Sequence, residues 1–439
     1  MIEQYSIRGS DASEIAASAE RAVAAGVFIA GQQLPTVRAL ARHLSVSPAT
    51  VAAAYRTLKL RGIISGSGRH GTTVKPMPPL VMRSAPLVAD DVRNLAAGGP
   101  DPALLPPLVS NLPQAFSRHS YGEPYNRSDL LKLAAQLFEA DGVPAGAIAV
   151  VSGALDGIER LLQANLRVGD RVAVEDPGYP PVLDLVAAVG LRAEPLAVDE
   201  SGPLPGEFSR LMKMGVSAAI ITPRAQNPTG AALDPERVRE IRRLLKHYPQ
   251  VMVIEDDHAG PVSGAPALTL CDASQQRWAV VRSLSKSLGP DLRLALVTGD
   301  EMSIVRLEGR QRLGAGWVSH LLQQLAVALL TDSNTRRLVN QAEQRYAHRR
   351  RDLLDAMAER EIAAQGRSGF NIWIPVPEEF AVVQSMLAAG WAISAGERYR
   401  IKSPSAVRIS IGNLMQGEAQ RIAAALAHSL APHSRAHYA

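Results

Sequence analysis

The sequence has little cysteine, few aromatic residues and no long apolar run. Cys271 is the one cysteine among 439 residues, so an intramolecular disulfide framework is excluded. No apolar stretch approaches the roughly 18 residues that a membrane helix needs. The first residues, MIEQYSIRGSDASE, carry acids and have no apolar core, which excludes a secretory signal. We therefore expect a soluble protein in a reducing, cytoplasmic setting.

Length and composition predict at least two folded domains. A chain of 439 residues is longer than one hydrophobic core usually organises. Hydrophobic residues make up 46% of it and charged residues 20%, which is globular composition and excludes disorder over most of the length.

The excess of positive charge lies entirely in residues 1–75. This segment has nine Lys and Arg against four Asp and Glu, which leaves 38 residues of each sign for the rest of the chain. A compact basic module ahead of a neutral body suggests a polyanionic partner. A solvated basic face is the alternative explanation of the same count.

Three short helices are predicted in the basic segment, each from a polar residue ahead of an amphipathic run. Residues 11–25 form the first, with Ser10 as its capping residue. Thr36 precedes the second and Ser47 the third, and only the residues LSV separate these two helices. Such a tight turn is typical of a helix-turn-helix.

Two β-prone runs joined by glycines, IISGSGRHGTTV, follow the third helix and predict a hairpin or wing. The third helix would enter a major groove, and basic residues around it would meet phosphates. The candidate DNA contacts are Arg38, Ser47, Ala49, Thr50, Arg56 and Arg69. A three-helix docking domain without DNA is the alternative, but the localised charge, the tight turn and the wing together favour DNA binding.

The stretch LPTVRALARHLSVSPATVAAAYRTLKLRGII resembles the GntR family of winged helix-turn-helix regulators. The resemblance implies a DNA-binding domain over residues 1–75. Ala49 departs from the family pattern, because relatives often carry a long polar or basic residue there. Residues 76–93 are Pro-rich and lack a periodic pattern, which predicts a semi-rigid linker. The second domain is then expected over residues 94–439.

Strand-like apolar runs alternate with helical patterns beyond the linker. The runs are AIAVVS, RVAVEDP, AAIITP, VMVIED, WAVVRS and LALVTG. This alternation predicts an α/β domain with a mainly parallel sheet. The residues that stand out just after the runs are Gly153, Tyr179, Asn227, Asp256, His258 and Lys286. Ligands of open α/β sheets bind at the carboxyl ends of strands, so we expect one site there.

An anion site is predicted from one strand-to-helix turn and one lysine segment. The amides of Gly153, Ala154 and Leu155 open a helix and can face an anion. Ser283 and Arg293 flank the lysine and can complete a phosphate site, since the Arg fork suits phosphate geometry.

The other candidate groups suit an aromatic aldehyde. Lys286 can form an imine with an aldehyde, and the buried Asp256 needs a cation such as a protonated ring nitrogen. Tyr179 offers a flat face for stacking, and Asn227 offers an amide to a phenolate oxygen. Each residue alone has an ordinary structural explanation as a turn, cap, core or surface residue, but their order is difficult to obtain by accident.

That order is similar to fold type I aminotransferases, which bind pyridoxal 5′-phosphate (PLP). The resemblance covers almost all of the second domain. It implies that Lys286 forms the imine with the cofactor, that Asp256 pairs with the pyridinium nitrogen and that Asn227 binds ring O3′. Tyr179 would stack on the ring, and Ser283 and Arg293 would hold the phosphate.

Two further residues match the same family. Arg408, in AVRISIG, matches the arginine that binds a substrate carboxylate. Tyr121, in YGEPYN, matches a tyrosine that reaches the phosphate of the neighbouring subunit. The resemblance therefore implies a homodimer, arranged head to tail.

Several positions depart from the aminotransferase pattern. His258 stands where relatives have a tyrosine near ring O3′, and Leu155 and Asp156 stand in the phosphate turn where amide or other polar residues are common. Asn126 and Leu131 replace the glycine and arginine that usually follow the YGxP motif. These changes argue against an efficient transaminase and leave cofactor binding intact.

A GntR-like head joined to an aminotransferase-like body resembles the MocR subgroup of bacterial transcription regulators. Within it, the motifs SGALDGIERLL, AVEDP, TPRAQNPTG, DDH, SLSKSLGPDLRLALV and WVSHLLQQ are similar to a regulator of vitamin B6 salvage. The resemblance implies a DNA-binding regulator that senses PLP and controls a gene such as one for pyridoxal kinase. No metal site and no catalytic residue are expected.

Two alternatives remain open at this point. One is a PLP-dependent aminotransferase with a vestigial or regulatory head, in which Lys286 is catalytic. The other is a regulator that holds PLP permanently and senses an amine or amino acid through Arg408.

Overall fold

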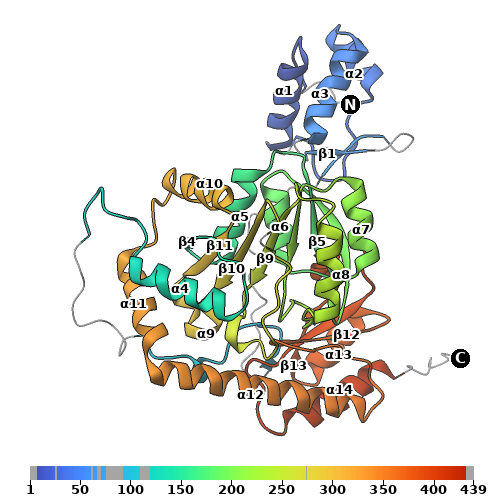
Figure 1. Ribbon diagram of the computed structural model, residues 1–439. Coiled ribbons are helices and arrows are strands. Elements are labelled where there is room, and N and C mark those ends of the chain that lie inside the picture. Colours follow the sequence, from blue (N-terminus) through green and yellow to red (C-terminus); the bar gives the residue numbers. More distant parts are fainter. Residues whose placement is uncertain are drawn as a thin grey trace, which may run out of the picture. The chain divides into compact units, whose positions relative to one another are not determined.

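The computed structural model describes residues 7–24, 27–60, 63–66, 71–75, 92–108, 119–272 and 274–431. Two separate hydrophobic cores organise these residues. One lies within residues 7–74 and the other within residues 95–426. Figure 1 labels the helices and strands of both folded parts.

The N-terminal part contains three helices and a hairpin, as the sequence predicts. The helices are α1 (Ala12–Ala24), α2 (Val37–Leu44) and α3 (Pro48–Leu60), and the strands β1 (Ile64–Ser65) and β2 (Thr73–Val74) pair antiparallel. The apolar stripe of α3 is fully inside, since Val51, Ala54 and Leu58 have no exposed surface. Both α1 and α2 pack on α3.

Capping explains where these helices begin, with one correction. Thr36 and Ser47 each accept a hydrogen bond from the amide three residues on, at 3.2 and 3.1 Å, as predicted. Ser10 is not the cap of α1. Asp11 takes that place, because its carboxylate accepts from two first-turn amides at 2.8 and 2.9 Å. Ser10 instead donates to the carboxylate of Glu14 at 2.9 Å.

The C-terminal part is built on an eight-stranded sheet in the order β4-β11-β10-β9-β8-β5-β6-β7. The strands are β4 (Ala147–Val151), β5 (Arg171–Asp176), β6 (Arg192–Asp199), β7 (Gly202–Pro203), β8 (Ala218–Ile221), β9 (Met252–Asp257), β10 (Trp278–Ser283) and β11 (Ala295–Gly299). The neighbours β5, β8, β9 and β10 run parallel, and β11 lies antiparallel between β10 and β4. The prediction of a mainly parallel sheet is confirmed, and all six predicted runs are strands.

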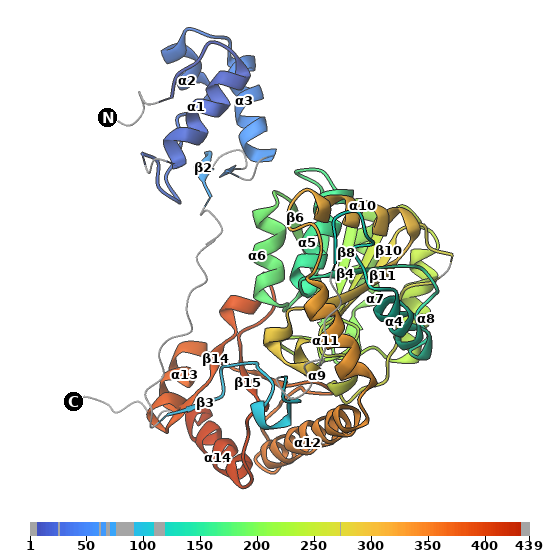
Figure 2. The same cartoon turned by 90° about the vertical axis from the view of Figure 1, so that its left-hand side faces the viewer.

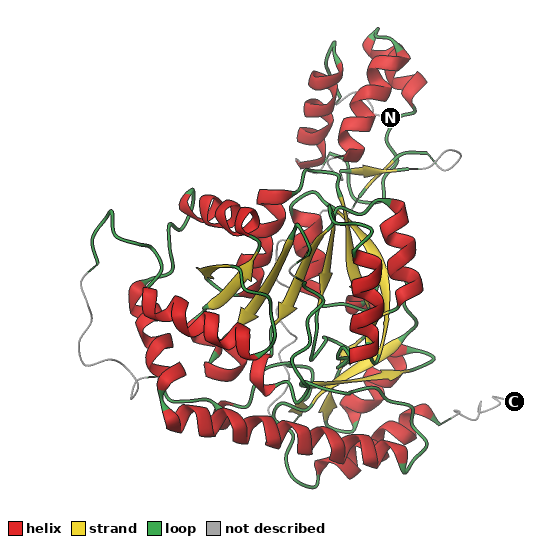
Figure 3. Ribbon diagram, in the orientation of Figure 1, coloured by secondary structure: helices red, strands yellow, loops and turns green. Residues whose placement is uncertain are grey.

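Helices cover both faces of this sheet (Figure 3). The helices of this part up to the smaller layer are α4 (Ser128–Ala140), α5 (Ala154–Asn165), α6 (Pro180–Ala188), α7 (Pro205–Met214), α8 (Pro235–Leu245), α9 (Ser285–Leu288), α10 (Glu301–Arg312), α11 (His320–Thr331) and α12 (Ser333–Ala358), of which α12 runs below the sheet and not on a face. Figure 2 shows α5 and α6 on one face and α7 and α8 on the other. Since both faces are covered, strands such as β8 and β9 are buried throughout and read as continuous apolar runs.

A smaller layer follows α12. Strands β12 (Asn371–Pro375), β15 (Ala406–Ser410) and β14 (Ser394–Ala395) form an antiparallel sheet, flanked by α13 (Glu379–Ala388) and α14 (Glu418–Leu430). Strand β13 (Trp391–Ala392) pairs in parallel with β3 (Arg93–Asn94). Of the predicted linker, residues 76–91 lie outside the described residues, whereas Arg93 is already part of β3.

Across the described ranges, no helix combines the length and apolar character that crossing a membrane requires.

One buried carboxyl group of the sheet has an unusual environment. Glu255 in β9 is 1% exposed and accepts hydrogen bonds from the Thr269 hydroxyl, at 2.7 Å, and from the Leu270 amide. Burial disfavours its charged form and raises the pKa of Glu255 to about 7. The group is therefore protonated in the folded chain over a pH range in which it is ionised in the unfolded chain.

Replacement Glu255→Gln should flatten the dependence of stability on pH. The pKa of Glu255 rises on folding, so its stabilising contribution is complete below pH 4.5 and declines as the pH rises towards about 7. The wild type should lose up to about 3 kcal/mol through this group across that interval. Urea unfolding of the full-length protein between pH 5 and 7.5 measures the difference. Parallel pH profiles for variant and wild type would contradict the assignment.

Candidate functional site

The predicted site residues lie at one edge of the large sheet. Strands β4, β5, β8, β9 and β10 run in the same direction, so their carboxyl ends meet at that edge. The residues that follow these ends, or close them, are Gly153, Tyr179, Asn227, Asp256, His258 and Lys286. Strand β11 is antiparallel and begins at the same edge, which places Arg293 there as well.

Lys286 belongs to the short helix α9, which follows β10 directly. Its Nζ donates to the carbonyl oxygen of Gly98 at 2.8 Å and lies 5.7 Å from the centre of the Phe370 ring. Burial and the nearby positive charge of Arg408 lower the pKa of Lys286 to about 8. A substantial fraction of the side chain is then the neutral, nucleophilic amine slightly above neutral pH.

Asp256 is a buried carboxyl group for which the described residues provide no ion pair. It is the penultimate residue of β9, is 4% exposed, and its Oδ1 has no hydrogen-bond partner among the described residues. Burial, with the neighbouring carboxyl groups of Asp257 and Glu175, raises the pKa of Asp256 to about 7. A buried, unpaired acceptor of this kind favours a ligand that brings a proton donor or a cation.

The adjacent Asp257 has the opposite surroundings. Its carboxylate accepts from Arg224 at 2.8 and 2.9 Å and from Arg282 at 2.8 Å, and Asp141 pairs with both arginines. Burial alone would raise the pKa of Asp257, but the two arginines hold it well below its usual range. Successive side chains of a strand point to opposite faces, so Asp256 faces away from this network.

His258 follows the two acids and is neutral. Its Nε2 lies 2.8 Å from the carbonyl oxygen of Ala225. A carbonyl can only accept, so Nε2 carries the proton and Nδ1 is a bare acceptor. Burial and the charge of Lys286 lower the pKa of His258 to about 4.

Arg408, on β15, brings the smaller layer to the site. Its guanidinium donates to Asn227 Oδ1 at 3.0 Å and to the carbonyl oxygen of Ala96, and it lies 5.0 Å from the centre of the Tyr399 ring. The residue is 4% exposed, and its Nε has no hydrogen-bond partner among the described residues. Tyr179 is near enough to both Asp256 and Arg408 for their charges to affect its pKa, which burial chiefly raises.

The turn between β4 and α5 brings Gly153 next to Arg293 at the start of a helix. Gly153 has φ of +116°, and a Cβ there would lie 3.0 Å from a terminal nitrogen of Arg293. Arg293 itself donates to the carbonyl oxygen of Ser152 at 3.4 Å. Ala154 and Leu155 are the first residues of α5, so their amides are free of intrahelical partners. Ser283 is buried, and its hydroxyl accepts from the Ser285 amide at 3.2 Å.

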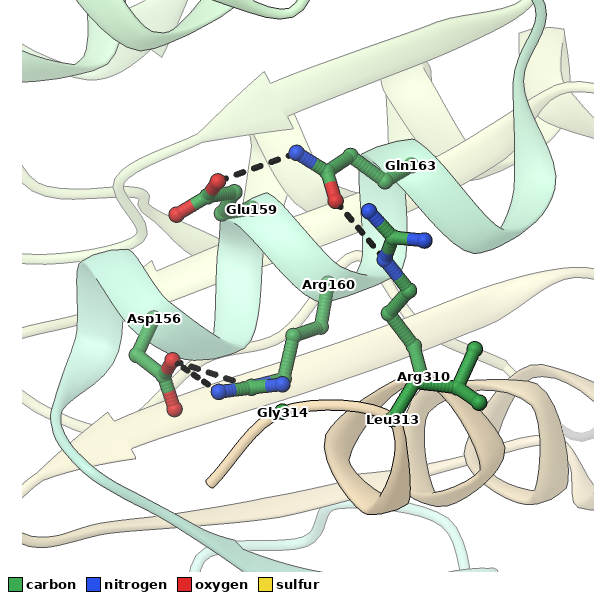
Figure 4. A pocket seen from close by; sticks show the side chains of 7 residues that line it. All are labelled: Asp156, Glu159, Arg160, Gln163, Arg310, Leu313 and Gly314. Atoms are coloured by element: carbon green, nitrogen blue, oxygen red, sulfur yellow. Dashed lines mark hydrogen bonds and ion pairs between the residues drawn. The ribbon is translucent and has the colours of Figure 1, made fainter. Parts of the chain in front are cut away.

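Asp156, in the first turn of α5, links the end of β4 to Arg160. Its carboxylate accepts from the Ser152 amide at 3.0 Å and pairs with Arg160 at 2.7 Å. Both residues line a groove between α5 and α10, together with Glu159, Gln163, Arg310, Leu313 and Gly314. Figure 4 shows that the polar side chains of this groove bond to one another, with Gln163 joining Glu159 and Arg310 at 2.9 Å each.

Tyr121 lies apart from these groups within the chain. It is 94% exposed, and its ring packs edge-on against Trp317, with 6.0 Å between the ring centres. The same tryptophan stacks on Tyr125 at 5.3 Å.

The predicted DNA contacts are accessible where the structure describes them. Arg38, Ser47, Ala49 and Arg56 are exposed, and Thr50 is partly exposed. The hydroxyl groups of Ser47 and Thr50 bond to each other at 2.8 Å, so each still has capacity for one further partner. Arg69 lies outside the described residues.

Comparison with known proteins supports this two-part description. Residues 11–74 match the gntR family of bacterial regulatory proteins, and residues 90–426 match aminotransferase class I and II. The vitamin B6 salvage pathway transcriptional repressor PtsJ of Salmonella typhimurium is 38% identical over 428 residues, which cover 97% of this chain and 99% of that protein. The chain belongs to the GntR-family regulators that carry an aminotransferase domain.

Other relatives of this regulator are more distant. The pyridoxine biosynthesis transcriptional regulator PdxR of Corynebacterium glutamicum is 27% identical over 77% of each chain. Kynurenine aminotransferase of Pyrococcus horikoshii has a similar fold, with a TM-score of 0.69 and 21% identity over 78% of this chain and 91% of that chain. The latter similarity concerns the fold alone.

Replacement Asp257→Asn should destabilise this regulator strongly. It leaves Arg224 and Arg282 buried with less compensating charge, and breaking a buried ion pair in this way costs about 3–5 kcal/mol. Asp141→Asn removes the more exposed acid of the same network and is the matched control, with an expected loss of about 1 kcal/mol. Urea unfolding followed by tryptophan fluorescence measures both. Equal, small losses would show that the network contributes little.

Proposed function

We propose that this regulator binds PLP at the carboxyl edge of the large sheet and that its affinity for DNA changes when PLP is bound. The observation that carries the proposal is the buried Asp256, whose unpaired Oδ1 lies in the same site as a lysine of lowered pKa. A pyridine ring that bears an aldehyde matches both groups at once. The similarity to a repressor of vitamin B6 salvage supports the same ligand.

The residues at this edge fit the cofactor group by group. Bound PLP supplies an aldehyde, a protonatable ring nitrogen and a phosphate. Lys286 would provide the amine for covalent attachment, Asp256 would hold the ring-nitrogen proton, and Asn227 would bind the ring oxygen. Tyr179 would cover the ring. The phosphate would be held by Ser283, Arg293 and the amides of Gly153, Ala154 and Leu155.

Two features support a sensor with little or no turnover. His258 gives its only proton to the Ala225 carbonyl, so it cannot also donate to a ring oxygen in this tautomer. Arg408, which would bind a substrate carboxylate, is already engaged by Asn227 and Ala96. A substrate would have to replace these contacts before it could react.

The proposed division of the chain follows from the same account. Residues 1–75 would bind operator DNA, the predicted linker would end before Arg93, which belongs to β3, and the part from Arg93 onwards would bind PLP and form a head-to-tail homodimer. The exposure of Tyr121 supports a role across the subunit interface, at the phosphate of the partner's cofactor. By similarity, the controlled gene would serve vitamin B6 salvage, such as a gene for pyridoxal kinase.

The regulatory step would be a shift between two arrangements of the dimer. A ligand changes such an equilibrium only by its difference in affinity for the two states. Attachment at Lys286 and capture of the phosphate would favour one arrangement, and the DNA-binding heads would then meet operator half-sites at a changed spacing.

A DNA shift assay on the protein's own upstream region tests this proposal. The affinity for the fragment should change over a PLP titration, and a visible cofactor absorption should appear in parallel. Lys286→Ala should show neither response, because it lacks the attachment point. Unchanged DNA affinity of the wild type over the full titration would refute the proposal.

A carboxylate-bearing amine is the second candidate effector. The buried Arg408 with its unpaired Nε supports it. In that case DNA affinity should respond to an amino acid only when PLP is present, and Arg408→Ala should abolish that response. An aminotransferase would instead convert the bound cofactor to its amine form at a useful rate, which spectra recorded with a panel of amino acids and amines would reveal.

Replacement Arg56→Ala should weaken binding to every DNA sequence. Arg56 is exposed on the predicted DNA-facing side of α3, where it would contact a phosphate. Removing that contact should reduce the slope of log affinity against log salt concentration by about one unit. Arg21→Ala, on α1, removes the same charge from an exposed position outside the predicted contact surface. Equal effects of the two variants would show that only net charge matters.

A further inference from the structure

The first described segment of the C-terminal part passes directly through the candidate site. Residues 93–101 begin as β3, where the amides of Arg93 and Leu95 donate to the carbonyls of Gly390 and Ala392 at 2.9 and 2.8 Å. Arg93 also forms a two-pronged ion pair with Glu418, at 2.8 and 3.0 Å. At the other end, the amide of Asp101 donates to the Tyr346 hydroxyl at 2.9 Å.

Between these anchors, the segment is bound by the two principal cations of the site. Lys286 donates to the carbonyl of Gly98 at 2.8 Å, and Arg408 donates to the carbonyl of Ala96. Gly98 packs so closely on Arg408 that a Cβ there would lie 3.3 Å from the guanidinium. One three-residue stretch, 96–98, therefore occupies donors on both the proposed attachment lysine and the proposed carboxylate-binding arginine.

A ligand at either cation competes with the segment for these donors. Lys286 would hold PLP through its amine nitrogen, which would give up hydrogens to the water released from the aldehyde oxygen. The nitrogen would then have at most one hydrogen, so its hydrogen bond to the Gly98 carbonyl would be weakened or lost. A carboxylate on Arg408 would likewise displace the Ala96 carbonyl, because a charged acceptor is the stronger partner.

We propose that residues 96–98 compete with PLP for the donors of Lys286 and Arg408, that attachment of PLP to Lys286 releases them, and that this release alters DNA binding by the N-terminal domain. The chain runs from these residues through β3 directly into residues 76–91 and the domain before them, so a change in their docking acts on the linker. This inference rests on the proposed function. It adds residues 96–98 as the segment that couples the PLP site to the DNA-binding domain.

Hydrogen exchange of the full-length protein tests the release directly. The amides of Ala96 and Ala97 donate to Asn94 Oδ1 at 3.0 and 3.1 Å, and Leu95 is held by β13. These three amides should exchange slowly in the empty protein and about tenfold faster with PLP bound. Exchange read by mass spectrometry on peptides spanning residues 92–101 gives the result.

Two variants distinguish release of residues 96–98 from Lys286 from a general loss of structure in the segment. Lys286→Met keeps the apolar stem without the donor, so it should exchange fast at residues 95–97 without PLP and bind DNA as the PLP-loaded wild type does. Tyr346→Phe removes the hydrogen bond to the Asp101 amide and leaves the ion pair between Asp101 and Arg349, so its residues 95–97 should still respond to PLP. Peptides from β8 and β9 report whether each variant remains folded.

The outcomes distinguish this inference from the proposed function. If PLP changes DNA affinity but leaves exchange at residues 95–97 unchanged or slower, the inference that PLP releases residues 96–98 is wrong and the sensor proposal stands. If Lys286→Met is folded but keeps slow exchange there, the inference is also wrong. If PLP alters neither exchange nor DNA affinity in the wild type, the proposed function itself fails.

Discussion

The buried carboxyl group of Asp256 is the constraint on which the site depends. Folding removes it from water at the end of a central strand, and the described residues give its Oδ1 no donor. Such a group is unfavourable unless it binds a proton or a partner. Burial and the neighbouring acids raise the pKa of Asp256 to about 7, and a ligand with a protonated ring nitrogen would stabilise its charged form. The proposed preference for an aromatic nitrogen base would follow from this feature of the fold.

Asp257 shows that this isolation is specific to one position. The two acids are adjacent in β9, yet Asp257 lies between two arginines, whereas the described charges that shift the pKa of Asp256 are those of the acids Asp257 and Glu175. Successive side chains of a strand point to opposite faces of the sheet. Asp257 therefore joins the arginine network on one face, and Asp256 is directed to the other. Lys286, whose pKa burial lowers, and the neutral His258 lie at the same edge of the sheet, which would suit the proposed attachment of an aldehyde without a strong proton donor at its ring oxygen.

Local patterns in the sequence were sufficient for the elements and for the residues at strand ends. The caps Thr36 and Ser47, the stripe of α3 and the six apolar runs are short-range features, and each was predicted correctly. The misassigned cap of α1 is also local: a serine and an aspartate stand side by side, and the ionised group makes the stronger bonds. Gathering Asn227, Asp256 and Lys286 in one site followed from the rule for parallel sheets.

Contacts between distant segments could not be predicted in this way. Lys286 meets Gly98 and Arg408 meets Ala96 across 188 and 312 residues of chain, and no periodicity links such positions. The pairing of Asp156 with Arg160 is local and four residues apart on a helix, so the sequence could have indicated it. A role for Tyr121 towards a second chain was implied only by resemblance and stays a proposal.

The proposed coupling between PLP binding and DNA binding is tested most directly by measuring PLP affinity with and without DNA. If PLP changes the affinity for operator DNA by some factor, DNA must change the affinity for PLP by the same factor. The dissociation constant for PLP should therefore be measured by absorbance, with and without saturating DNA from the protein's upstream region. The account predicts two constants that differ by the factor found in DNA titrations with and without PLP. Identical constants would contradict it.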